Sequence, residues 1–255
     1  MTFRNVSLSI HDGVAVLRLA SPSKAANALG LSVLKELREA ATQARRTRAV
    51  KLLVLTGSGR SFSSGVDRAE LQAADPEAIR ALLGGGQALV RQILNFDLLT
   101  IAAINGVALG GGLELALSCD IRWAHQRAVL GLPEARLGLV PGWGGMSLLR
   151  RTVPESLWVE MVVGGECIGA HRAYDYGLVS RIFEGHDFEA KVVAAALKLA
   201  DATEIVLETV KAELKRERAA IDPAAADGSF LSLWNGRRNG TPATRLDGTN
   251  TRAPR

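Results

Sequence analysis

Hydrophobic and polar residues follow strand-like and then helical periods along the first part of the chain. Two short apolar runs, residues 6–10 and 14–19, flank the turn-forming pair Asp12-Gly13. Such a pair between alternating runs is typical of a β-hairpin. Residues 31–44 then place leucine and alanine at helical spacing, which predicts an amphipathic helix.

The middle of the chain alternates buried strands with helices. We expect strands over 51–56, 100–105, 121–124 and 128–130, and helices over 78–93 and 113–118. Gly84-Gly85-Gly86 falls inside the first of these helices. Glycine costs about 1 kcal/mol per position in a helix interior, so we expect a break or a mobile stretch there. Strands that alternate with helices favour an α/β fold.

The last third is mainly helical. The periodicity predicts helices over 155–163, 170–176, 187–201 and 203–219, with one strand over 178–183. We therefore divide the chain into a core, residues 1–195, and a helical C-terminal region, residues 196–255. After Asp222-Pro223 the sequence has few apolar residues besides Trp234. We expect the last ten to fifteen residues to be disordered.

Composition narrows the setting in which the protein works. Hydrophobic residues make up 47% of the 255 residues, yet no apolar run approaches the about 20 needed to span a membrane. The start of the chain lacks the apolar segment of a secretory signal. Two cysteines form no disulfide framework, and the four histidines lack metal-ligand spacing. We expect a cytoplasmic protein without a metal site.

The net charge of +5 invites comparison with nucleic-acid-binding proteins. Most of this excess lies in residues 237–255, which hold five arginines and one aspartate. A solvated basic tail explains that distribution better than a nucleic-acid-binding arm does. Nucleic acid is therefore an unlikely partner.

Glycine-rich motifs supply the candidate chemistry. The chain contains no Gly-x-Gly-x-x-Gly after its first strands, no P-loop and no Gly-x-Ser-x-Gly. It does contain Gly110-Gly111-Gly112 between a buried strand and a helix that carries Glu114. Bare backbone N–H groups at a helix start attract negative charge. The segment predicts a hole for an anion with an acid or base beside it.

Several segments, taken together and in order, resemble the crotonase family, whose best-known member is enoyl-CoA hydratase. The resemblance covers roughly residues 6–215 and rests on Phe62-Ser63-Ser64-Gly65-Val66-Asp67, residues 103–115, Cys119-Asp120, Pro133-Glu134, residues 138–145 and residues 170–179. It implies a spiral of ββα units with a helical C-terminal trimerisation region. It also implies a homotrimer or a dimer of trimers, and an acyl-CoA substrate with no further cofactor.

The resemblance also assigns roles to residues. It implies that the N–H groups of Val66 and Gly111 form an oxyanion hole for the thioester oxygen, and that Glu114 and Glu134 share the attacking water. The substrate-binding residues that it implies are Lys24, Ala26, Ser64, Asp67, Pro133 and Gly142. Lys24, Ala26 and Ser64 would lie near the CoA nucleotide, and the N–H of Gly142 would help to hold the water.

Alternatives remain at this stage. A glutamate in the first turn of a helix often only complements the helix dipole, and Asp67 is as suited to fixing a loop as to touching substrate. Trp143 is equally suited to a pocket wall and to packing. Having both glutamates favours hydration, but a double-bond isomerase, another acyl-CoA lyase or an RNA-binding relative that uses the basic tail stay open. Acyl chain length is open as well.

Overall fold

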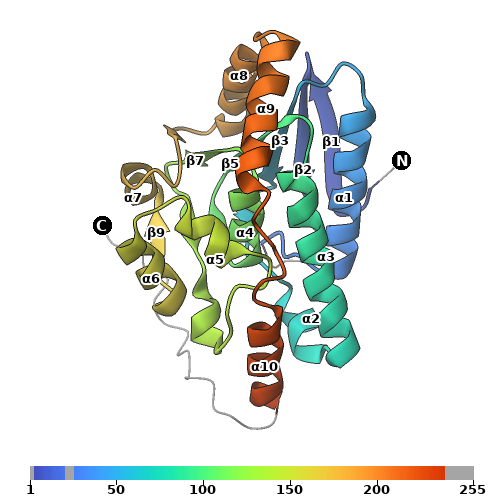
Figure 1. Ribbon diagram of the computed structural model, residues 1–255. Helices are drawn as coiled ribbons and strands as arrows, with labels where there is room; N and C mark the ends of the chain where they lie inside the picture. The colour runs from blue at the N-terminus through green and yellow to red at the C-terminus, as the bar shows by residue number, and fades with distance from the viewer. Residues whose placement is uncertain (1–2, 21–25, 239–255) are drawn as a thin grey trace.

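A six-stranded sheet forms the centre of the computed structural model, which describes residues 3–20 and 26–238 (Figure 1). Its strands run in the order β1 (Val6–His11), β2 (Val14–Leu19), β3 (Leu52–Gly57), β5 (Leu99–Ile104), β7 (Ile121–His125) and β10 (Arg181–Phe183). The hairpin pair β1 and β2 is antiparallel, and the other pairs are parallel. The predicted hairpin and strands are confirmed, with β10 shorter than expected.

A smaller four-stranded sheet accompanies the first. Its order is β4 (Ser61–Ser63), β6 (Val107–Leu109), β8 (Val129–Gly131) and β9 (Cys167–Gly169). The strand pairs β3/β4, β5/β6 and β7/β8 each place one strand in each sheet before the chain enters a helical segment. This repeated turn is the ββα spiral that the resemblance implied. Three of the four short strands were not predicted, because three residues carry too little periodicity.

Helices cover both faces of the large sheet. On one side lie α1 (Leu31–Arg46), α3 (Pro76–Leu94) and α4 (Gly111–Ser118), and on the other α8 (Phe188–Ala200). In β3, Leu53 and Leu55 join the first core, whereas Leu52 and Val54 pack with Val192 of α8 in the second. Burial on both faces explains why this strand is a continuous apolar run.

The expected break at Gly84-Gly85-Gly86 is wrong, because α3 is continuous from Pro76 to Leu94. A side chain at Gly86 would overlap the ring of Trp143, so a glycine is needed for close packing at this point. The buried apolar face of α3, which includes Ile79 and Val90, holds the helix together despite its low local propensity.

The remaining helices lie around these two layers. They are α2 (Arg68–Ala73), α5 (Gly145–Arg150), α6 (Glu155–Val163), α7 (Ala170–Asp175), α9 (Glu204–Arg218) and α10 (Asp227–Arg238), with a 3₁₀ helix η1 (Pro133–Leu137). Helices α2, α5 and α10 were not predicted. Residue 195 falls inside α8, and the division at that point stays a prediction. The tail beyond residue 238 lies outside the described residues.

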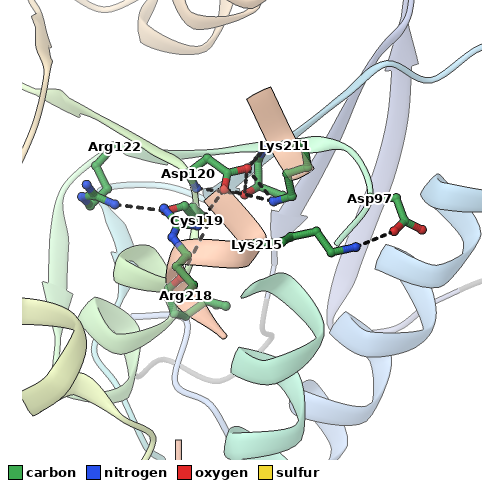
Figure 2. A network of polar contacts seen from close by, with 9 residues as sticks. Asp97, Cys119, Asp120, Arg122, Lys211, Lys215 and Arg218 are labelled. Atoms are coloured by element: carbon green, nitrogen blue, oxygen red, sulfur yellow. Dashed lines mark hydrogen bonds and ion pairs between the residues drawn. The ribbon is translucent and has the colours of Figure 1, made fainter. Parts of the chain in front are cut away.

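Buried ion pairs fasten α9 to the core (Figure 2). Lys211 and Arg218 of α9 donate to the carboxylate of Asp120, with Nζ of Lys211 2.7 Å from Oδ2 and the guanidinium of Arg218 2.7 Å from Oδ1. The backbone N–H and hydroxyl of Thr100 also donate to Asp120. None of the helices in the described part of the chain is both long and apolar enough to cross a bilayer.

Candidate active site

The start of α4 meets the small sheet through Gly110. Its φ of 51° and ψ of −127° lie outside the regions open to most side chains, and its N–H donates to the carbonyl of Gly131 at 3.0 Å. A side chain at Gly111 would overlap the ring of Trp143. These contacts bring bare backbone to the N-terminus of a buried helix, as the glycine motif predicted.

A second loop, residues 64–66, lies against this helix start. A Cβ built on Gly65, whose φ is 89°, would lie 2.6 Å from the carbonyl oxygen of Leu109 and 3.3 Å from the backbone nitrogen of Gly111. The N–H groups of Val66 and Gly111 donate no hydrogen bond within the described residues. Two unused donors therefore stand on neighbouring loops, where an oxyanion could accept from both.

Glu114 lies one turn into α4 and is 2% exposed. Its Oε1 accepts from the backbone N–H of Trp143 at 2.8 Å and of Gly145 at 2.7 Å. Burial raises the pKa of Glu114 to about 7, although N–H donors from Gly145, Trp143 and Gly142 favour its charged form. A carboxyl with such a pKa exchanges protons readily near neutral pH.

Glu134 follows Pro133 at the start of η1. Its Oε2 is buried and has no hydrogen-bond partner within the described residues, and its Oε1 faces Gly110. Burial, and then the charge of Glu114, raise the pKa of Glu134 well above its usual range. A buried carboxyl oxygen without a partner is costly to keep, so its retention points to a use in chemistry.

One cavity brings these groups together. It has a volume of about 80 Å³ and is bordered by Val66, Gly111, Glu114 and Glu134. Its apolar walls come from α2, α3, η1, α10 and the loop that follows η1, chiefly Leu71, Ile79, Leu82, Leu83, Leu137, Leu139, Trp143 and Phe230. Trp143 is thus both a pocket wall and a core residue, only 2% exposed. A dry apolar pocket strengthens the electrostatic interactions inside it.

The other predicted substrate-binding residues divide into three groups. Ser64, Pro133 and Gly142 line the cavity. Ala26 does not line it, but its carbonyl accepts from the N–H of Ser64 at 3.0 Å. Asp67 does not line it either, because its carboxylate caps α2 by accepting from the N–H groups of Ala69 and Glu70. Lys24 lies outside the described residues.

Sequence reasoning missed two contributors to the site. Gln87 of α3 is buried and donates to the carbonyl of Gly142 at 2.9 Å and to the carboxylate of Asp227, so it links α10 to the loop whose N–H groups donate to Glu114. A lone glutamine on an apolar helix face was the only available signal. Phe230 of α10 reaches the cavity although its helix was not predicted. No group of three or more His, Cys, Asp or Glu side chains suited to a metal occurs among the described residues.

Comparison with known proteins agrees with this geometry. A family model described as enoyl-CoA hydratase/isomerase matches residues 9–228. A probable enoyl-CoA hydratase of Bacillus subtilis is 41% identical over 76% of this chain and 74% of its own length. A crotonyl-CoA hydratase of Syntrophomonas wolfei is 35% identical over 83% of this chain and 82% of its own.

The solved structures agree as well. The crystal structure of an enoyl-CoA hydratase from Bacillus anthracis superposes with a TM-score of 0.81 at 30% identity, covering 93% of this chain and 90% of that one. The similarity in fold therefore spans nearly the whole chain.

Proposed function

The chain belongs to the enoyl-CoA hydratase/isomerase family, and from that premise we propose that it adds water across the 2,3 double bond of a 2-enoyl-CoA thioester. The observation that carries the proposal is the pairing of two buried carboxyl groups, Glu114 and Glu134, in one cavity with two unused backbone donors. Hydration needs one group that takes a proton from water, one that gives a proton to carbon, and a hole for the enolate oxygen.

The N–H groups of Val66 and Gly111 would hold the thioester oxygen. Negative charge grows on this oxygen as hydroxide adds at C3, so donors fixed beforehand stabilise the transition state more than the substrate. The positive end of the α4 dipole adds to their effect. Losing one such donor costs about 3–4 kcal/mol of transition-state stabilisation. Backbone donors impose no side chain at position 66, which is compatible with valine there.

The two carboxyl groups would divide the proton transfers. With a pKa of about 7, Glu114 is partly ionised at neutral pH and accepts a proton from the attacking water. Glu134, whose pKa is raised well above its usual range by burial and by the charge of Glu114, would donate its proton to C2. One proton is taken up and one is given, and exchange with solvent restores both groups after product leaves. The pair titrates as a unit, since each charge affects the other.

The direct test follows loss of the conjugated thioester absorbance on addition of crotonyl-CoA. Glu114→Gln and Glu134→Gln keep the size of each side chain but remove the titrating group, and each should lower turnover by several orders of magnitude. Product mass separates hydration, which adds one water, from double-bond isomerisation, which adds nothing. Near-full turnover in either variant would remove that glutamate from the mechanism.

We also propose that the enzyme works in the cytoplasm as a trimer or a dimer of trimers, with no metal or redox cofactor beyond the CoA of its substrate. Exposed apolar side chains on the C-terminal helices, including Ile205, Val206, Val210 and Leu233, support an assembly that buries them. Light scattering on the purified protein tests the oligomeric state. Turnover after dialysis against a chelator tests independence from metal.

A further inference from the structure

A second cavity opens beside the catalytic one, between α2, η1 and α10. Its volume is about 240 Å³, and it is lined by Arg68, Leu71, Gln72, Leu137, Trp234 and Arg237. The two cavities share Arg68, Leu71 and Leu137, so the second adjoins the first. Figure 1 shows α10 near α2 at the lower end of the molecule, where this extension lies.

The charge of this extension is one-sided. Arg68 and Arg237 contribute two positive charges, and no aspartate or glutamate lines the cavity. Neither guanidinium makes a hydrogen bond or ion pair within the described part of the chain, whereas Arg18 and Arg172, for example, pair with glutamates. An arginine fork without a partner is suited to bidentate binding of a carboxylate.

Apolar side chains accompany Arg68 where the two cavities meet. Leu71 and Leu137 border both cavities, as Arg68 does, and Leu82, Leu83 and Phe230 line the catalytic side. A chain that leaves the reacting carbons between Glu114 and Glu134 would pass these apolar walls and reach Arg68 at the boundary and Arg237 beyond it. That order, a few methylene groups and then an anionic end, is the order of groups in a dicarboxylic acyl chain.

We propose that the substrate is an enoyl-CoA whose acyl chain ends in a second carboxylate, held by Arg68 and Arg237. This inference rests on the proposed hydration, since it names the substrate class of the same site. The phosphates of CoA are the competing anions for these arginines. Ser64, which the family resemblance places near the nucleotide, does not line the second cavity. The leucine side chains that border both cavities suit methylene groups rather than phosphates.

The test separates binding from turnover by using saturated acyl-CoAs, which cannot be hydrated. Calorimetry would compare adipyl-CoA, which ends in a carboxylate, with hexanoyl-CoA of equal chain length. We expect wild type to bind the carboxylated compound at least about tenfold more tightly, the scale of a hydrogen bond to a charged group. The double variant Arg68→Gln/Arg237→Gln should abolish this ratio, and Arg68→Lys/Arg237→Lys should retain part of it.

Arg46→Gln is the matched control, because Arg46 lies in the last turn of α1 and lines neither cavity. It should leave the ratio unchanged. Equal affinity of wild type for both compounds would overturn the inference. The inference would also be overturned if Arg68→Gln/Arg237→Gln weakened the binding of adipyl-CoA and hexanoyl-CoA equally, because the arginines would then bind the CoA part that the two compounds share. Failure of wild type to hydrate both crotonyl-CoA and the 2-enoyl derivative of adipyl-CoA, with the binding ratio intact, would overturn the hydratase proposal alone.

Discussion

Two places in this molecule bury carboxyl groups, and they treat them in opposite ways. The side chain of Asp120 is 1% exposed and accepts hydrogen bonds from Lys211 and Arg218 (Figure 2). It also accepts from Thr100. Glu134 keeps one oxygen buried with no partner within the described residues, and it shares its cavity with a second carboxyl group, that of Glu114. The first arrangement holds α9 on the core. The second leaves a proton available for chemistry.

The difference suggests how a buried carboxyl group that stabilises the fold can be distinguished from one suited to proton transfer. A carboxylate whose acceptor sites are filled by cations and N–H donors is stabilised in its charged form. A carboxyl group without such donors is forced toward its neutral form, at the expense of folding stability. Substitutions at the two places should therefore affect different measurements.

The largest expected effect is on catalysis. Glu134→Gln should lower kcat by about a hundred- to ten-thousandfold, the usual contribution of a positioned general acid. The free energy of unfolding should stay equal or rise, because the variant removes an uncompensated buried carboxyl group. Crotonyl-CoA turnover and urea denaturation measure the two quantities. A large loss of stability with little loss of turnover would reverse the assignment.

Asp120→Asn should act mainly on stability. It leaves Lys211 buried without its counter-charge, and breaking one side of a buried ion pair costs about 3–5 kcal/mol. Turnover per folded molecule should stay near that of wild type. Urea denaturation measures the change in the free energy of unfolding. The control is Glu213→Gln, which breaks the exposed pair of Glu213 with Arg216 on the same α9 helix. That change should be below about 1 kcal/mol. A loss of stability in Asp120→Asn no larger than that in Glu213→Gln would contradict the role of Asp120 in holding α9 on the core.

A smaller effect comes from the glycines of α3. In Gly86→Ala the new methyl group would displace the ring of Trp143, a residue whose backbone N–H donates to Glu114. Overpacking of this kind costs about 1–3 kcal/mol of stability. Gly84→Ala meets no atom within 4 Å and should stabilise the helix by about 0.5–1 kcal/mol. Thermal melts and crotonyl-CoA turnover would compare the two. The same outcome for both variants would show that Trp143 does not need the space at position 86.

The last prediction concerns pH. The folded pKa of Glu114 is about 7 and its ordinary value is 4.5, so the folded state binds more protons between these values. Stability from this group is fully present below pH 4.5 and is lost as pH rises through 7, by at most about 1.4 kcal/mol per pH unit. Urea titrations across this range should show a steeper decline for wild type than for Glu114→Gln. Parallel curves would mean that Glu114 is not perturbed.

Local patterns in the sequence were sufficient for much of the fold. Apolar periodicity identified the hairpin, the long strands and α1, because each depends on residues close together in the chain. The motif around Gly110-Gly111-Gly112 predicted a helix start with exposed N–H groups, because only glycine allows that backbone to be approached. Family resemblance then pointed to Glu114 and Glu134, and the structure places both on one cavity.

Tertiary structure alone decided the rest. Glycine propensity predicted a break at Gly84-Gly85-Gly86, but packing against Trp143 outweighed it. The roles of Gln87, α10 and Lys211 depend on partners far away in the sequence, such as Gly142 and Asp120. A residue's neighbours in the chain determine its backbone preference, whereas its pKa, its burial and its partners depend on what folding brings beside it. For that reason the sequence identifies the candidate carboxyl groups, and the fold separates the one that holds a helix from the two that we propose transfer protons.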